Sequence, residues 1–379
     1  MKKTIKIDIV DYHFYYGQTF YNSLFYRLLS KKYDVVRSKN PDFLIHSVYP
    51  PGNKPFQFTQ YDCTRILYSP ECVAPNFEID DYALTFDYIE SERHFRLPFF
   101  RYLNNYQYLF REKKDPELAL REKKKFCNFV QGNVFMPQTY MRTEFFKKLS
   151  RYKKVDSLGS FLNNAGYSIN LYDIHDIDRH ISQYKFSISF ENTSCRGYTT
   201  EKIMNALLGG TIPIYWGDPQ VGFDFNPKCF INCGSFDTFE EVIEHVREVD
   251  ANDRLWMDYY AQPVFENGHE PDHLKEAAIE CFLSRIIENP FPLGKPAYQF
   301  HGLKPYWQKI YSAFYYYNRS KIVLAERKIN KNLLKTLLLY LDLAAHFFVV
   351  CAVPSKLSKM LIGPQIFFEK VLFKIISWL

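Results

Sequence analysis

The stretch FENTSCRGYTTEKIMNALLGGTIPIYWGD, residues 190–218, changes from one kind of secondary structure to another and decides the fold class. The run KFSISF, which ends at Phe190, has the length and alternation of a strand, and the polar residues after it predict a loop. Apolar residues then recur at helical spacing from Thr200 to Leu208, with Thr199 or Thr200 as the cap and a Gly-Gly pair as the stop. TIPIYW predicts the next strand. This strand–helix–strand order is typical of a parallel sheet in an α/β protein.

The first turn of the predicted helix carries a cation where one is disfavoured. Lys202 lies at the positive end of the helix dipole, and an anionic ligand would explain its position. Free backbone N–H groups at the same helix end are suited to phosphate. Glu201 can accept hydrogen bonds from sugar hydroxyls, and Tyr198 can pack its ring or donate its hydroxyl. The alternative is that Glu201 and Lys202 form an exposed ion pair with no ligand.

The same strand and helix pattern extends in both directions along the 379 residues, a length that suits two domains. Five runs of strand length, KIDIV, YDVV, DFLIHSV, RILYS and YALTF, lie in the first 110 residues. FCNFV, KFSISF, TIPIYW and CFINC form a second series. Two Rossmann-like halves in tandem predict a cleft between them. We expect one domain at 1–120, a second at 121–305, and a helical tail at 306–379.

The composition argues against nucleic-acid binding and against secretion. The net charge is +6, and six lysines and two acids from Lys331 onward contribute +4 of it, so the body is nearly neutral and a nucleic-acid role is disfavoured. The eight cysteines lack C-x-x-C or Cys/His spacing, which favours reduced thiols in a cytosolic protein. The amino terminus has no apolar run long enough for a signal peptide. The charged segment 111–125 is expected to be a surface connection, with a solvated linker or a helical excursion as the alternatives.

Several segments resemble the α-1,3/4-fucosyltransferases. KFSISFENTSCRGYTTEKIMNALLGGTIPIYWGDPQV, residues 185–221, matches the signature pattern K-F…F-E-N-S/T…Y-x-T-E-K…P-I/V-x-W/Y-G of that family. KKFCNFVQGN resembles the strand that opens the family's donor domain, and RILYSPECVAPNF resembles the segment that holds its proposed catalytic base. DYALTFDYIESERHFRLPFF is similar to the stretch that follows. The resemblance covers roughly residues 60–300.

This resemblance implies a GT-B fold, in which two Rossmann-like domains face each other across a cleft. It implies inverting transfer of L-fucose from GDP-fucose to O3 or O4 of N-acetylglucosamine in a lactosamine-type glycan. Glu71 is the implied catalytic base, although S-P-E-C departs from the more usual G-E-N or G-E-S. The implied donor-binding residues are Arg142, Asn192, Tyr198, Glu201 and Lys202, with Arg142 and Lys202 on the pyrophosphate.

Metal-dependent transfer and two other functions are the alternatives to this interpretation. Asp176 and Asp178 form a D-x-D pattern, but Asp178 is expected to cap a helix and the pattern lies outside the matched segments. No metal or other cofactor is therefore expected. A GT-B transferase for another nucleotide sugar would be distinguished by donor screening. An inactive glycan-binding relative would be excluded by hydrolysis of GDP-fucose without acceptor.

The tail predicts contact with a membrane. Residues 336–353 form an 18-residue apolar run, and IFFEKVLFKIISWL at the end places Lys370 and Lys374 on a narrow polar stripe. We expect a cytoplasmic protein attached peripherally to an anionic inner membrane, with a packed helix or a true span as the alternatives. This location suits a bacterial enzyme that adds Lewis-type fucose to lipopolysaccharide or capsule intermediates.

Overall fold

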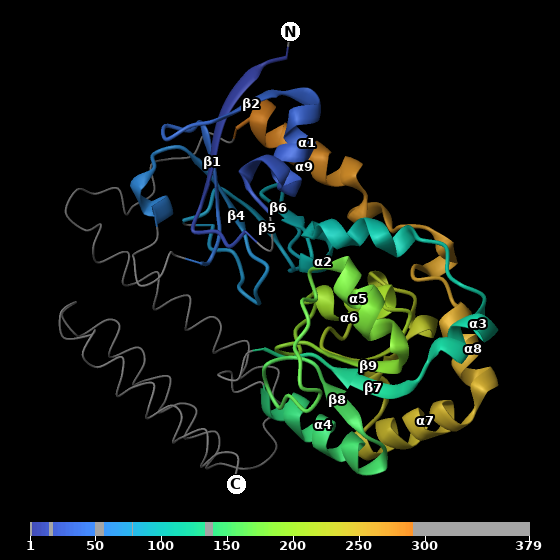
Figure 1. Ribbon diagram of the computed structural model, residues 1–379. Coiled ribbons are helices and arrows are strands. Elements are labelled where there is room, and N and C mark those ends of the chain that lie inside the picture. The colour runs from blue at the N-terminus through green and yellow to red at the C-terminus, as the bar shows by residue number, and fades with distance from the viewer. Residues whose placement is uncertain (1, 15–17, 50–56, 78, 133–138, 291–379) are drawn as a thin grey trace, which may run out of the picture.

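The computed structural model of the chain describes residues 2–14, 18–49, 57–77, 79–132 and 139–290. Two sheets with helices around them form two lobes that lie side by side (Figure 1). Every strand pair in both sheets is parallel. The expected α/β architecture of two Rossmann-like domains is therefore confirmed. The predicted tail at 306–379 lies outside the described residues.

The first lobe contains a six-stranded sheet with the order β2-β1-β3-β4-β5-β6. Its strands are β1 (Thr4–Val10), β2 (Asp34–Arg37), β3 (Phe43–His46), β4 (Thr64–Tyr68), β5 (Tyr82–Thr85) and β6 (His94–Arg96). Its helices are α1 (Leu24–Lys32) and α2 (Phe99–Tyr102). In β1 the isoleucines at positions 5, 7 and 9 point to the side covered by α1, which buries four apolar residues at helical spacing.

The second lobe contains a five-stranded sheet with the order β11-β10-β9-β7-β8. Its strands are β7 (Lys125–Phe129), β8 (Val155–Ser157), β9 (Tyr184–Phe190), β10 (Ile212–Trp216) and β11 (Ile231–Asn232). Its helices are α4 (Thr139–Tyr152), α5 (Ile174–His180), α6 (Glu201–Leu208), α7 (Phe239–Ala251) and α8 (Asp253–Ala261). The predicted strand–helix–strand unit is thus β9, α6 and β10. The carboxyl ends of its parallel strands meet at one sheet edge, the usual place for a ligand.

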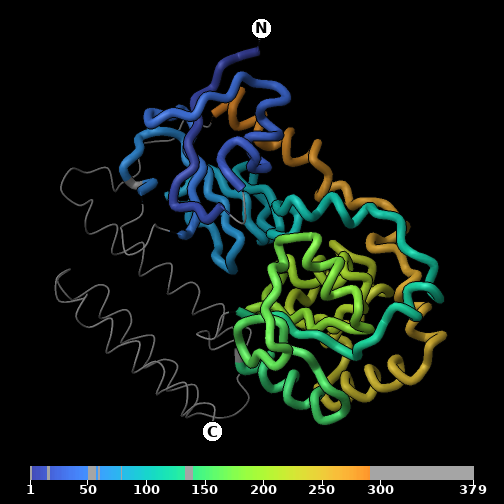
Figure 2. Tube along the Cα trace, viewed as in Figure 1, coloured from blue at the N-terminus to red at the C-terminus, as the bar shows by residue number. Residues whose placement is uncertain are grey.

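The last described helix, α9 (Glu276–Glu288), returns to the first lobe and lies beside α1 (Figure 2). Its apolar face joins the core of the first sheet. Glu276 also accepts hydrogen bonds from Arg27 and Lys31 on α1. The expectation that residues 121–305 form one domain is therefore wrong for this helix, which packs on the first lobe. An amphipathic pattern shows which face is buried, but not which sheet covers it.

Two local expectations differ from the structure. The charged segment 111–125 contains a helix, α3 (Pro116–Glu122), because Asp115 accepts from the backbone N–H groups of Glu117 and Leu118. The cap of α5 is Asp173, which accepts from the N–H of His175 at 2.9 Å. Asp178, the expected cap, lies inside that helix.

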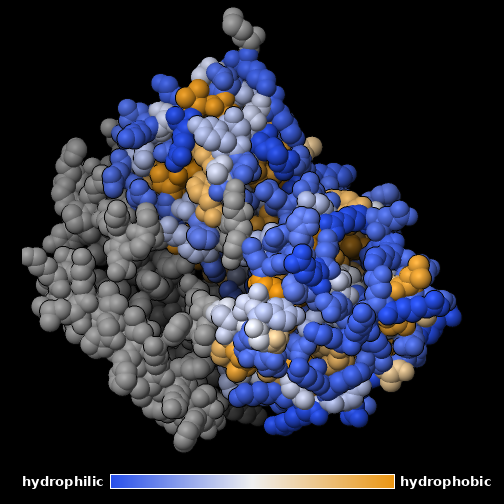
Figure 3. Space-filling view, in the orientation of Figure 1, coloured by the Kyte–Doolittle hydropathy of each residue, from blue (hydrophilic) through white to orange (hydrophobic). Residues whose placement is uncertain are grey.

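The surface of the described residues is mostly polar in the view of Figure 3, with small, separate hydrophobic patches. Within the described ranges, no helix is both long enough and apolar enough to cross a bilayer. The runs at 336–353 and 366–379 lie outside those ranges.

Candidate active site

The site is built around the loop at residues 191–200, which connects the carboxyl end of β9 to α6. Glu191, the first residue of the loop, is completely buried. Its two carboxylate oxygens accept from the N–H of Thr200 at 2.7 Å and from the hydroxyl of Thr200 at 2.6 Å. Thr200 occupies the N-cap position, but its side chain makes no capping hydrogen bond because it is directed to Glu191. The two ends of the loop are thereby joined.

The position of Lys202 is explained by carboxylates. Its ammonium lies 3.3 Å from Glu191 Oε2 and 3.4 Å from Glu201 Oε1, and it donates to the hydroxyl of Thr200 at 2.9 Å. Burial raises the pKa of Glu191, and the charge of Lys202 opposes that rise. Lys202 is therefore held in a fixed direction by acids on both sides of the helix start.

Arg142 approaches the same loop from α4. It is 6% exposed, and its Nε donates to the backbone carbonyl of Glu191 at 3.1 Å. A terminal guanidinium nitrogen donates to Asn192 Oδ1. Burial lowers the pKa of Arg142, while the carboxylate of Glu191 acts in the opposite direction. The structure thus brings Arg142, Asn192, Glu201 and Lys202 into one cluster at the end of β9.

Tyr198 lies where the two lobes touch. It is buried against Cys72 and Phe86 of the first lobe, with its ring and that of Phe86 5.3 Å apart and edge to face. Burial raises the pKa of Tyr198 far above its ordinary value. Tyr198, which was expected to line the donor pocket, makes a packing contact that joins the lobes.

Glu71, next to Cys72, faces the second lobe from the end of β4. Its Oε1 accepts from the hydroxyl of Tyr49 at 2.6 Å. The carboxylate of Glu71 acts electrostatically on both Arg142 and Tyr198, which places it close to the cluster. One carboxylate of the first lobe therefore lies close to a cation, Arg142, and to a buried tyrosine, Tyr198, of the second lobe.

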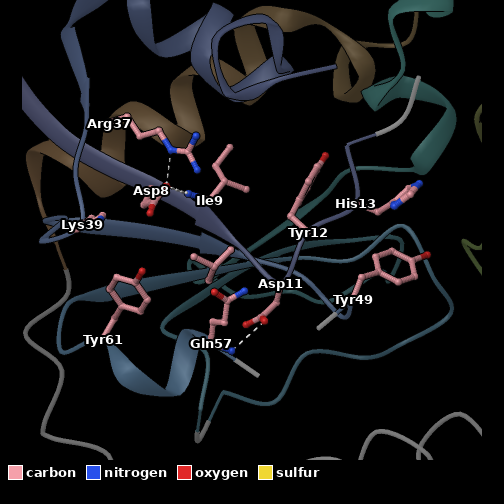
Figure 4. A pocket seen from close by; sticks show the side chains of 11 residues that line it. Asp8, Ile9, Asp11, Tyr12, His13, Arg37, Lys39, Tyr49, Gln57 and Tyr61 are labelled. Atoms are coloured by element: carbon pink, nitrogen blue, oxygen red, sulfur yellow. Dashed lines mark hydrogen bonds and ion pairs between the residues drawn. The ribbon is translucent and has the colours of Figure 1, made fainter. Parts of the chain in front are cut away.

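A cavity of about 730 Å³ opens at the carboxyl ends of β1 and β2 (Figure 4). Arg37 donates to Asp8 Oδ1 at 2.9 Å on one side of it, and Asp11 accepts from the backbone of Gln57 at 2.8 Å. The side chains that line it are Asp8, Ile9, Val10, Asp11, Tyr12, His13, Arg37, Lys39, Tyr49, Gln57 and Tyr61. Because Tyr49 also contacts Glu71, the cavity adjoins the candidate base.

The acids of the D-x-D pattern have structural partners. Asp176 accepts from the N–H of Asn170 at 2.9 Å, and Asp178 pairs with Arg111 at 3.0 Å. In the part of the chain that the structure describes, no group of three His, Cys, Asp or Glu side chains is arranged to hold a metal ion.

Three residues that the sequence interpretation did not assign organise the loop: Glu191, Asp218 and Arg96, which donates to the backbone carbonyl of Gly197 at 3.0 Å. Asp218 accepts from the N–H of Gly197 at 2.8 Å and from the hydroxyl of Thr199 at 3.0 Å. Glu191 belongs to the quoted F-E-N motif, so an acid directly after a buried strand was the available signal. Arg96 and Asp218 had no comparable signal.

Two family models match the chain. "Glycosyltransferase family 10 (fucosyltransferase) C-term" matches residues 120–281, and "Alpha-(1,3)-fucosyltransferase FucT N-terminal domain" matches residues 8–103. Alpha-(1,3)-fucosyltransferase FucT of Helicobacter pylori is 29% identical over 308 residues, which is 71% of this chain and 63% of that protein. Alpha-(1,3)-fucosyltransferase B of Drosophila melanogaster is 33% identical over 127 residues, 31% of this chain and 28% of that one. The chain thus spans less than two thirds of the length of these curated relatives.

Solved structures agree with the sequence matches. A crystal structure of an alpha1,3-fucosyltransferase has a TM-score of 0.66 and 27% identity, covering 76% of this chain and 92% of the other. The structure of an alpha1,3-fucosyltransferase with GDP-fucose has a TM-score of 0.61 and 26% identity, covering 77% and 92%. The 191–200 loop and most of both lobes lie within the residues matched by the two family models. The chain therefore belongs to glycosyltransferase family 10, the fucosyltransferases.

Proposed function

We propose that this protein transfers L-fucose from GDP-fucose to O3 of an N-acetylglucosamine in a lactosamine-type glycan, with inversion at the fucose carbon. The observation that carries the proposal is that Glu71 of the first lobe acts electrostatically on Arg142 of the second, and that Arg142 and Lys202 both bind Glu191 at the end of β9. A solved relative of the family is in complex with GDP-fucose, which supports the donor.

The reaction needs a base on one side of the fucose and positive charge on the other. The acceptor O3–H attacks the anomeric carbon while the bond from that carbon to the diphosphate oxygen breaks. The hydroxyl proton goes to Glu71, and the electron pair of the broken bond leaves with GDP. Attack from the side opposite to the leaving group inverts the anomeric centre. A positioned base contributes about 10²–10⁴-fold to such a step.

Arg142 and Lys202 supply the charge that stabilises the departing diphosphate. Arg142 presents a planar fork suited to bidentate phosphate contact. Lys202 lies in the first turn of α6, where backbone N–H groups add to its charge. No metal is included in this proposal because these two cations perform the task that a divalent ion performs elsewhere. Glu201 and Asn192 are proposed to hold the hydroxyl groups of the donor.

Tyr49 keeps the base Glu71 oriented and also lines the cavity in which we place the acceptor. Its hydroxyl donates to Glu71, which leaves the second carboxylate oxygen to accept the proton. We place the acceptor glycan along the cavity that Tyr49 helps to line. Paired charges such as Arg37 and Asp8 offer both donors and acceptors to sugar hydroxyls, and the aromatic rings can pack on sugar faces.

The cellular setting is proposed from the sequence. The apolar, lysine-bearing tail would attach the chain peripherally to the anionic inner face of a bacterial membrane. Lipopolysaccharide or capsule intermediates at that face would then receive fucose in Lewis-type linkages. If a chain ending near residue 330 bound anionic vesicles as well as the full chain does, this attachment would be wrong.

The test is product formation by the full chain from GDP-fucose with N-acetyllactosamine or lacto-N-biose, in excess chelator. We expect fucose on O3 of the N-acetylglucosamine of N-acetyllactosamine, identified by mass and linkage analysis. GDP-mannose and UDP-galactose serve as control donors. Transfer only from a control donor, or no binding of GDP-fucose, would refute the proposal, and activity restored only by manganese would refute its metal-free part.

A further inference from the structure

Arg96, the last residue of β6, crosses from the first lobe to the second. Its two terminal nitrogens each donate to an oxygen of Asp224 at 2.7 Å. One of them also donates to the backbone carbonyl of Gly197 at 3.0 Å. Its Nε donates to the backbone carbonyl of Phe86 at 3.0 Å, so one guanidinium bonds to groups of both lobes.

This ion pair is buried and has further support. The side chain of Asp224 is fully buried and that of Arg96 is 9% exposed. Burial alone would raise the pKa of Asp224, but the charges and hydrogen bonds of Arg96 and His273 together leave that pKa below its usual value. His273 lies 2.8 Å from the same carboxylate, and the ring of Tyr88 lies 4.4 Å from the guanidinium carbon. A charge pair in this setting holds one geometry.

The carbonyl that Arg96 binds belongs to Gly197, a tightly constrained residue of the 191–200 loop. Gly197 has φ = +85°, and a Cβ there would come within 2.4 Å of the carbonyl oxygen of Phe86. Asp218 binds the N–H of Gly197 from the side of the second lobe, so both polar groups of this residue are held. Tyr198, the next residue, packs on Cys72 beside Glu71.

We propose that Arg96 is a positioning residue for fucose transfer: by holding Gly197, it fixes the distance between the base Glu71 and the 191–200 loop. This inference rests on the function proposed above. Arg96 binds Asp224, Gly197 and Phe86 and is not among the residues proposed to hold the donor, so it acts through the loop. A lysine can reach Asp224, but a single ammonium cannot also hold the carbonyls of Gly197 and Phe86 in this planar arrangement.

The test separates positioning from binding and from stability. In Arg96→Lys we expect kcat for fucose transfer to fall about 10–100-fold, because small displacements of reacting groups cost this much. The Kd of GDP, measured by calorimetry, should change less than about threefold, because Arg142 and Lys202 are untouched; a tenfold change would correspond to about 1.4 kcal/mol. Arg111→Lys is the matched control: Arg111 also pairs with an aspartate, Asp178, and stacks on a tyrosine, but at an exposed site.

A second variant covers the case in which Arg96→Lys does not fold. Tyr88→Leu removes the ring stacked on the guanidinium, a ring that also contacts Arg196 and Phe223, and Tyr88 is 37% exposed. For this variant we again expect a lower kcat with an almost unchanged Kd of GDP, but the fall in kcat should be smaller, at least about twofold. An unchanged kcat in folded variants, or a fall in GDP affinity as large as the fall in kcat, would overturn the inference. Absence of transfer by the unmodified protein would instead refute the proposed function.

Discussion

Replacing Glu191 with glutamine changes one charge at the centre of the cluster and almost nothing else. The side chain keeps its volume, but one carboxylate oxygen becomes an NH₂ group. Depending on which oxygen is replaced, that group meets the N–H of Thr200 or lies between the hydroxyl of Thr200 and the ammonium of Lys202. In both cases a hydrogen-bond donor faces donors in a site without water access. The loop should then lose the closure between its two ends.

The expected loss follows from the contacts. A hydrogen bond to a charged group contributes about 1.5–3 kcal/mol to the free energy of unfolding. Because Lys202 keeps Glu201 as a second partner at 3.4 Å, we expect Glu191→Gln to lower that free energy by an amount within this range. For a lobe of this size, it corresponds to a fall of about 3–12 °C in Tm. Because Lys202 would no longer be held toward the diphosphate, kcat/KM for GDP-fucose should fall about 100-fold.

Three measurements on the folded variant test the reasoning: Tm, GDP affinity by calorimetry, and kcat/KM for transfer. The matched control is Asp250→Asn, which removes a buried carboxylate that pairs with Lys153 at 2.9 Å near the opposite end of the second sheet. This control should lower Tm but leave GDP affinity unchanged. Burial raises the pKa of Glu191, so a neutral Glu191 in the folded protein is the competing case. Glu191→Gln would then change neither Tm nor kcat/KM, and that result would refute the argument.

Three further predictions concern single side chains. Glu71→Gln should lower turnover at least 100-fold with unchanged GDP affinity, measured by transfer assay and calorimetry, because the proton acceptor is lost. Lys202→Ala should also lower turnover at least 100-fold but should weaken GDP binding as well, and a folded variant within a few fold of the original would remove Lys202 from its role. Burial raises the pKa of Asp87 from 3.8 to about 6, so its stabilising contribution is complete below about pH 4 and is lost as the pH rises through 6. As the pH rises from 4 to 7, the free energy of unfolding of Asp87→Asn, measured in urea, should therefore increase by up to about 3 kcal/mol relative to that of the original chain. A difference between the two proteins that does not depend on pH would contradict this pKa.

The sequence predicted the parts of the fold whose signals are local. β9, α6 and β10 were expected because an apolar alternation, a helical spacing and a Gly-Gly stop lie within one short stretch. The short strands β6 and β8 have only three residues each, too few for a period to be recognised. The return of α9 to the first lobe depends on which sheet is free to cover its apolar face, and this is a property of the folded chain.

The candidate site shows the same division between local and distant signals. Arg142 and Lys202 were assigned because a family motif marks their positions, and the structure brings them together around one loop. The importance of Glu191 depends on its burial, and an acid after a strand is ordinarily read as part of a solvated loop. The pairing of Arg96 with Asp224 joins residues 128 positions apart, and no spacing rule connects two charged residues at that separation.

The ends and the middle of the 191–200 loop therefore perform different tasks. At its ends, Glu191 closes the loop on Thr200 and aligns Lys202, so this region governs how the diphosphate is held. Near its middle, Gly197 is fixed by Arg96 and governs where Tyr198 and Glu71 lie. Buried ion pairs contribute little net stability compared with apolar packing, so stability alone does not explain why charges are placed at both points. The proposed reaction explains these charges, because a base on one lobe must then meet a sugar held by the other lobe. The loop, fixed at both points, sets the position of the base relative to the sugar.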